Sequence, residues 1–243
     1  MADYNYKILC EKIFSWIHTN EIKSGGQIFC VDLGLTKYDD AYRLQLDLFE
    51  HVRAGNTDGI VLLLEHPPVI TLGSNRSRKN LIADESILKI QGIELVQSDR
   101  GGDITLHAPG QLVCYPVFNL SHFGRDLILF VTNLEQVIIN VLSEYGIEGR
   151  RIEKLRGVFV GSGKIASVGI RVRKWVTLHG FSFNINTDLG YFKNIISCGL
   201  KDFKQTSMQE ILGKEVPLNR IKEAVIRNME LVFKVRILNI TIA

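Results

Sequence analysis

Three strand-length apolar segments follow one another with only short turns between them, and this succession limits the possible folds more than any other feature. The segments run from Gly157 to Val160, from Lys164 to Val172 and from Trp175 to Ile185. Their connections hold too few residues for the crossover helix that parallel neighbours require. We therefore expect antiparallel pairing here, which argues against a regular doubly wound sheet.

The rest of the chain alternates irregularly between helix and strand patterns. Apolar residues recur at helical spacing most clearly from Asp126 to Tyr145, and Gly146 follows as a terminator. Ser207 and Glu210 form a capping box before a short helix that Gly213 ends. Further helices are expected at residues 1–25, 39–53, 84–91 and 221–232, and further strands at 27–33, 59–65, 69–72, 94–97 and 112–118.

These patterns together predict the fold class and the domain organisation. The expected class is α/β (α+β), with a mixed, largely antiparallel sheet flanked by helices. We find no internal repeat or Pro/Ser-rich linker, so residues 1–243 are expected to form a single domain. Residues 1–25 would be a helical extension of it.

Composition is that of an ordinary globular protein. Of the 243 residues, 46% are hydrophobic and 23% are charged, and no uninterrupted apolar run approaches the roughly 20 residues that span a bilayer. The segment from Met1 to Asn20 lacks the apolar stretch of a secretion signal. Asp3, Glu11 and the lack of arginine before Arg43 disfavour a mitochondrial presequence. We expect a cytoplasmic protein that does not associate with membranes.

Charge and cysteine content disfavour several kinds of site. The net charge of +3 is too small to indicate nucleic-acid binding. None of the four cysteines belongs to a C-x-x-C pair, so neither a structural zinc site nor dithiol redox chemistry is expected.

A glycine-rich segment from Arg100 to Gln111 is the first candidate for ligand binding. Its paired glycines allow the backbone to approach a ligand and to present N–H groups, while Arg100, Thr105 and His107 add polar side chains. It lacks the spacing of a phosphate loop and the following helix of a dinucleotide fingerprint. Taken alone, such a turn between strands is more often structural.

Three further segments carry residues that can do chemistry. They run from Lys164 to Gly169, from His179 to Asn184, and across Ser197-Cys198-Gly199. A lysine opening an apolar strand is usually a surface residue whose stem packs on the sheet. A lone histidine is usually structural, and a lone cysteine is usually a small buried apolar residue. Cys198, however, lies in a glycine-containing loop, where a thiol can be exposed and reactive.

Together these blocks resemble the lipoyl(octanoyl) transferase family. The family pattern R-G-G-x-x-T-x-H-x-P-G-Q, then K-I-A-x-x-G, then H-G-x-x-x-N and finally C-G appears here in the same order. The resemblance runs from about Val31 to Leu212. It implies the fold of the biotin and lipoate protein ligase catalytic domains.

The resemblance also implies an activity and a role for each block. Cys198 would hold the acyl group as a thioester, and Lys164 would lower the pKa of that thiol and exchange protons during transfer. An octanoyl or lipoyl group would pass from acyl carrier protein to a lysine of lipoyl domains in 2-oxoacid dehydrogenase complexes or of the glycine cleavage H protein. No ATP or metal would be needed. The acyl site would comprise Arg100, Gly101, Gly102, Asp103, Ile104, Thr105, Leu106, His107, Ser167, Val168, Gly169, Gly180, Phe181 and Ser182.

The chain departs from the family pattern at a few positions. Ala108 replaces a usual glycine, Ser197 a usual proline, and Gly73-Ser74 a usual Gly-Arg or Gly-Lys. Ala108 would matter only at positive φ, where a non-glycine residue costs on the order of 1 kcal/mol. Three alternatives stay open: an ATP-dependent lipoate ligase on the same fold, a non-catalytic acyl-binding or carrier-binding module, and a cysteine hydrolase.

Overall fold

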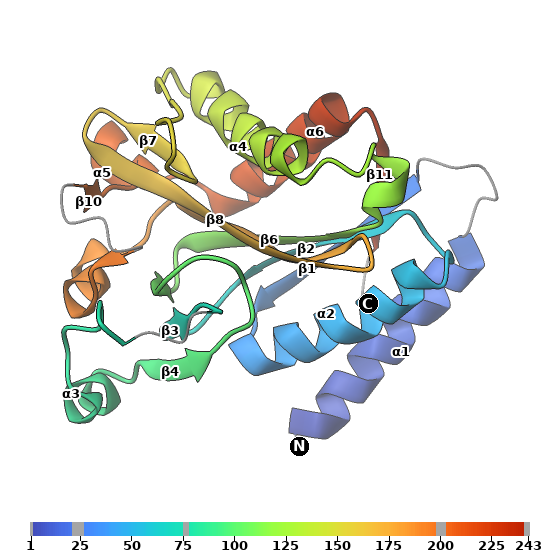
Figure 1. Cartoon of the computed structure of the whole chain (residues 1–243), viewed down its shortest axis with the longest axis horizontal. Helices are drawn as coiled ribbons and strands as arrows, with labels where there is room; N and C mark the ends of the chain where they lie inside the picture. Colours follow the sequence, from blue (N-terminus) through green and yellow to red (C-terminus); the bar gives the residue numbers. More distant parts are fainter. Residues whose placement is uncertain (1, 21–26, 75–77, 198–202, 241–243) are drawn as a thin grey trace.

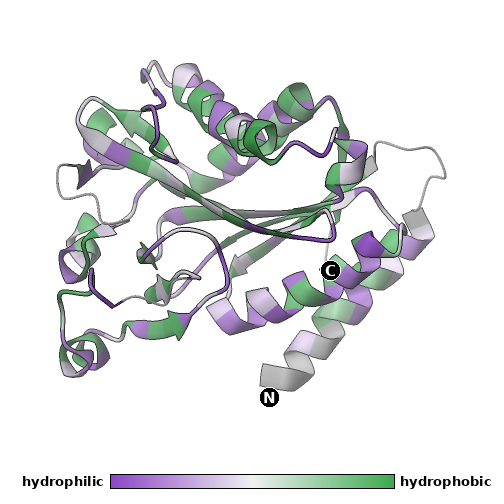
Figure 2. Ribbon diagram, in the orientation of Figure 1, coloured by the Kyte–Doolittle hydropathy of each residue, from purple (hydrophilic) through white to green (hydrophobic). Residues whose placement is uncertain are grey.

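The computed structural model describes residues 2–20, 27–74, 78–197 and 203–240. A twisted sheet lies between two layers of helices (Figure 1). Helices α4 (Leu127–Glu144) and α6 (Leu218–Phe233) cover one face, while α1 (Ala2–Asn20) and α2 (Tyr38–Arg53) cover the other. Hydrophobic residues follow the central strands and the helix faces turned toward them (Figure 2).

The main sheet contains eight strands within the described residues. Its order is β10 (Lys204–Gln205), β8 (Gly163–Arg173), β9 (Val176–Asn184), β6 (Gln111–Phe118), β2 (Gly59–Glu65), β1 (Gln27–Leu35) and β11 (Arg236–Ile240), and β7 (Val158–Val160) pairs with β8. Pairing is antiparallel from β7 through β8, β9 and β6 to β2. It is parallel where β1 meets β2 and β11 and where β10 meets β8. The predicted mixed, largely antiparallel sheet is confirmed.

A smaller sheet lies beside the main one and carries the glycine-rich segment. It consists of β4 (Glu94–Gln97), β3 (Val69–Leu72) and β5 (Thr105–His107), in that order. Helix α3 (Glu85–Ile90) precedes β4, and the 3₁₀ helix η2 (Leu189–Asn194) packs near it through Tyr191 and Phe192. The segment between β4 and β5 reaches the middle of β8, where Gly101 N–H donates to the carbonyl of Ile170 at 3.0 Å.

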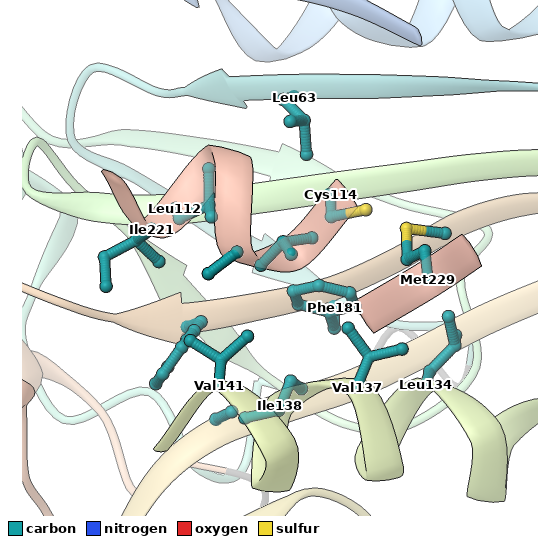
Figure 3. Packing of buried hydrophobic residues seen from close by; sticks show 14 of the residues in the cluster. Leu63, Leu112, Cys114, Leu134, Val137, Ile138, Val141, Phe181, Ile221 and Met229 are labelled. Carbon is teal, nitrogen blue, oxygen red and sulfur yellow. The ribbon is translucent and has the colours of Figure 1, made fainter. Parts of the chain in front are cut away.

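The main core lies between the sheet and the pair α4 and α6. Side chains of α4 point toward Phe181 and the β6 residues, and Ile221 and Met229 approach from α6 (Figure 3). The side chain of Asp126 caps α4 by accepting from Leu129 N–H at 2.9 Å. By length and composition α4 is also apolar enough to cross a membrane, but here its apolar face is buried in this core.

Local sequence signals agree with the element ends. Lys174 and Trp175 form the two-residue turn between β8 and β9, and both have positive φ, 48° and 64°. Ser207 caps α5 (Met208–Leu212), and Gly213 follows it at φ 67°. The short strands β5, β10 and β11 and the 3₁₀ helices η1 (Leu120–His122) and η2 were not predicted, because runs this short carry too little periodicity.

Candidate active site

A first chamber of about 50 Å³ lies where the glycine-rich segment crosses β8 and β9. We call it the inner chamber. It brings together residues from three of the candidate blocks, at positions 100–107, 167–169 and 179–182. Its lining comprises Tyr38, Arg100, Gly101, Gly102, Asp103, Thr105, His107, Tyr115, Ser167, Val168, Gly169, His179, Gly180, Phe181 and Ser182.

Two residues expected at the acyl site lie elsewhere. Ile104 and Leu106 are fully buried in the apolar cluster around the smaller sheet and do not line this chamber. Successive residues of a strand face opposite ways, so Thr105 and His107 can line the chamber only if Leu106 turns away from it.

Glycines are needed in the chamber walls because backbones approach closely there. A Cβ at Gly169 would lie 2.9 Å from the carbonyl oxygen of Gly101, and one at Gly101 would lie 3.0 Å from that of Ile170. Gly102 has φ 89°. Ala108, by contrast, is not at positive φ, so alanine fits this position without backbone strain.

Arg100 links the glycine-rich segment to β3. Its Nε donates to Thr71 Oγ1 at 3.0 Å, its Nη2 to the Thr71 carbonyl at 2.7 Å, and its Nη1 to the Gly101 carbonyl at 3.2 Å. The residue is only 7% exposed. Arg100 therefore fixes the chamber wall as well as contributing to its lining.

Two buried histidines are held neutral: His107 in the chamber wall and His66, which contacts His107 and Tyr115 behind it. His66 bonds the Thr36 carbonyl through Nδ1 at 2.6 Å and Tyr115 Oη through Nε2 at 2.8 Å. Burial lowers the pKa of His66 to about 4 and that of His107 well below its ordinary value. His107 Nδ1 also bonds Gln111 Oε1 at 2.7 Å. Neutral rings make this wall compatible with an apolar ligand.

Acidification from pH 7.5 to pH 5 is expected to lower the free energy of unfolding. His66 in the unfolded chain takes up a proton below about pH 6.5, whereas the folded protein does so only near pH 4, so stability falls through that window. The loss from His66 is about 2 kcal/mol at pH 5 by this linkage. Urea titrations at both pH values measure it. His66→Gln should show a smaller pH dependence, and equal wild-type midpoints would contradict the expectation.

An Asp99–His179 pair supports the same wall. His179 Nε2 lies 2.6 Å from Asp99 Oδ1, Tyr42 Oη donates to Asp99 Oδ2 at 2.6 Å, and the Tyr42 ring stacks on His179. Burial raises the pKa of Asp99, but the bonds from His179 and Tyr42 and the charge of Arg171 outweigh it and lower that pKa. Burial lowers the pKa of His179 although Asp99 opposes the change. His179 is therefore a hydrogen-bonded structural histidine that also faces the chamber.

A second, larger chamber of about 330 Å³ adjoins the inner one, and we call it the outer chamber. The two share a wall of Gly101, Gly102, Asp103, Val168 and Gly169. The rest of the outer chamber is lined by Val131, Lys154, Leu155, Arg156, Lys164 and Ile170. Candidate residue Lys164 therefore lines the outer chamber and not the inner one.

Lys164 is a buried residue, only 2% exposed, rather than the surface lysine that is usual at a strand end. Its ammonium lies 5.6 Å from the centre of the Phe159 ring. A Cβ at Gly157 would lie 2.9 Å from Lys164 Cε, so the stem packs closely against that glycine. Gly157 N–H in turn donates to the buried carboxylate of Glu135 at 2.9 Å. The lysine stem thus packs against the backbone at Gly157, which Glu135 of α4 holds in place.

Cys198 and Gly199 lie outside the described residues, so the pairing of Cys198 with Lys164 stays a prediction. Ser197, the residue before them, is 7% exposed.

Tyr38, Tyr115 and Asp99 were missed by sequence reasoning. Two tyrosines, on a helix and on a buried strand, and a single aspartate carry no local motif. Among the described residues, no group of three or more His, Cys, Asp or Glu side chains is arranged to hold a metal ion.

Known proteins are similar to this chain in sequence, and solved structures are similar to it in architecture. The family described as the lipoyl protein ligase A/B catalytic domain matches residues 37–230. An octanoyltransferase of Thermoanaerobacter sp. (strain X514) is 45% identical over 211 residues, which cover 86% of this chain and 92% of the relative. A solved T. acidophilum structure described as a lipoate protein ligase with bound lipoic acid has a TM-score of 0.71 at 18% identity, over 90% of each chain. A lipoate-protein ligase A bound with ATP has a TM-score of 0.69 at 16% identity, also over 90% of each chain.

Proposed function

The chain belongs to the family of the lipoyl protein ligase A/B catalytic domain and is an acyltransferase that moves octanoyl groups in protein lipoylation, and we propose that it does so through a thioester on Cys198. The donor in this proposal is octanoyl-acyl carrier protein. The acceptor is a lysine of a lipoyl domain in a 2-oxoacid dehydrogenase complex or of the glycine cleavage H protein. Residues 1–243 would act as one cytoplasmic domain.

The observation that carries the proposal is the pair of joined chambers with buried Lys164 in the outer one. We place the thioester carbonyl beside Lys164 and the far end of the acyl chain in the inner chamber. The chain would run along the shared wall of Val168 and Gly169. Burial of six methylenes at about 0.8 kcal/mol each supplies roughly 5 kcal/mol of binding. The inner chamber is narrow, so its side chains would adjust as the chain enters.

In the first half of the reaction the Cys198 thiolate attacks the carbonyl of the carrier thioester. The ammonium of Lys164 lowers the pKa of the Cys198 thiol and so raises the thiolate fraction. The bond between the carbonyl carbon and the carrier sulfur breaks, and that sulfur takes a proton from Lys164. The products are an acyl-Cys198 thioester, a free carrier thiol and a neutral Lys164.

In the second half the amine of the acceptor lysine attacks the acyl-Cys198 carbonyl. The amide bond forms, Cys198 leaves as thiolate, and the amine proton passes to Lys164, which restores the starting state. Exchange of one thioester for another is nearly isoenergetic, and conversion to an amide is downhill. For that reason we propose that neither ATP nor a metal is needed, although a structure sharing this fold was solved with ATP.

Intact mass spectrometry tests the covalent step. Wild-type protein mixed with octanoyl-carrier protein is expected to gain one octanoyl group, and Cys198→Ser should gain none. A lipoyl domain added afterwards should remove the adduct and gain the mass itself. Transfer that proceeds without an adduct and requires ATP would favour a ligase. Release of free octanoate without an acceptor would favour a hydrolase, and neither adduct nor transfer would favour a binding module.

A further inference from the structure

Three basic side chains line the outer chamber, against one acidic side chain, Asp103. Lys164 is buried, but Lys154 and Arg156 are exposed and so mark the solvent side. The apolar side chains of Val131, Leu155 and Ile170 line the same chamber. An apolar passage with a cationic entrance suits an extended ligand whose far end carries negative charge.

The loop that carries Lys154 and Arg156 is fixed to α4. Arg151 donates to Glu135 Oε2 at 3.1 Å, to Gln136 Oε1 at 3.0 Å and to the Thr132 carbonyl at 2.8 Å. At the other end of the loop, Gly157 N–H donates to Glu135 Oε1 at 2.9 Å. The basic side chains therefore project from a backbone that is held in place at both ends.

Lys154 occupies a backbone conformation that lysine seldom adopts. Its φ is 66°, at the third position of a turn closed by a 3.0 Å bond from Leu155 N–H to the Ile152 carbonyl. Glycine is the residue preferred there. Its described ion pair, with Glu153 at 3.9 Å, joins side chains that are 87% and 90% exposed and is therefore weak. A strained lysine at a chamber entrance is better explained by a ligand than by this pair.

We propose that the outer chamber binds the phosphopantetheine arm of the acyl donor, with the phosphodiester at Lys154 and Arg156 and the amide-bearing chain along Val131, Leu155 and Ile170. This inference rests on the proposed function, which places the thioester beside Lys164. The phosphodiester lies at the opposite end of the arm, so it emerges at the exposed side of the chamber. Direct recognition of the arm supplements whatever contacts the carrier protein itself makes.

The test compares octanoyl-4′-phosphopantetheine with octanoyl-pantetheine, which differ only by the phosphate. Lys154→Gly removes the charge and relieves the backbone strain, and Arg156→Gln removes the second charge. Lys174→Gly is the matched control, because Lys174 is also exposed with positive φ, 48°, and lines neither chamber. Initial rates of transfer to a lipoyl domain give KM and kcat for each thioester.

Each chamber variant is expected to raise KM for the phosphorylated thioester about two- to fivefold, as for loss of one exposed ion pair. The value of kcat should not change, and KM for octanoyl-pantetheine should stay that of the wild type. Equal effects on both thioesters, or the same effect in Lys174→Gly, would overturn the proposal. The proposal would also be overturned if transfer required ATP and this requirement became weaker in the chamber variants. If wild-type protein accepts neither thioester nor octanoyl-carrier protein, the proposed function itself fails, whereas a phosphate-independent KM in an active enzyme removes only this site.

Discussion

Replacing Lys164 with methionine is expected to slow octanoyl transfer by about 10²- to 10⁴-fold, the usual range for losing a proton-transfer group. Methionine preserves the apolar stem that packs against Gly157 and lies near the Phe159 ring, and the site is only 2% exposed, so the fold should persist. What is lost is the ammonium. Single-turnover measurements of Cys198 acylation, and of its discharge by a lipoyl domain, check both halves separately.

Lys164→Arg separates the two roles that the proposal gives to this lysine. Arginine keeps a positive charge near the thiol but does not give up a proton in proteins. Acylation by an activated thioester should therefore recover partly, while protonation of the leaving carrier thiol and acceptance of the amine proton should not. A Lys164→Met variant with wild-type rates and an unchanged urea midpoint would remove Lys164 from the mechanism.

The fold was predictable where periodicity is long, and not where pairing is distant in sequence. Strands β8 and β9 and helix α4 were found from alternation and from helical spacing, because each pattern extends over many residues. Strand β11 pairs with β1 although more than two hundred residues separate them, and β10 has only two residues. Neither has a local signal that distinguishes it from a loop.

The site was predictable as a set of blocks but not as two chambers. Resemblance identified residues 100–107 as one unit, whereas strand alternation in β5 turns Leu106 into the core and His107 toward the inner chamber. Tyr38 and Tyr115 join the wall because α2 and β6 pass behind it, which no spacing in the sequence reveals. Lys164 could be recognised as a candidate, but no spacing in the sequence places its side chain in the outer chamber and against Gly157.

Gly180→Ala is expected to lower the free energy of unfolding by about 3 kcal/mol, because the backbones of two strands approach closely at this glycine. This value is the upper part of the range for overpacking. Gly180 lies in β9 opposite Gly169 of β8, and it lines the inner chamber. A Cβ here would overlap the carbonyl oxygen of Cys114 and lie 2.6 Å from Pro116 Cδ. Both neighbours belong to β6, so the methyl group can fit only if β6 and β9 move apart.

Gly190→Ala is the matched control for this substitution. Gly190 also lacks a positive φ, but its close neighbour would be the Asp188 carboxylate at 2.9 Å, the end of a side chain that can shift slightly while still capping η2. Urea denaturation of the wild type and the two variants should show a large loss for Gly180→Ala and less than about 1 kcal/mol for Gly190→Ala. Because separation of β6 from β9 would also widen the chamber, Gly180→Ala should lose octanoyl transfer even at temperatures where it is folded. Equal stability of the two variants would contradict the expectation that the added methyl group forces β6 and β9 apart.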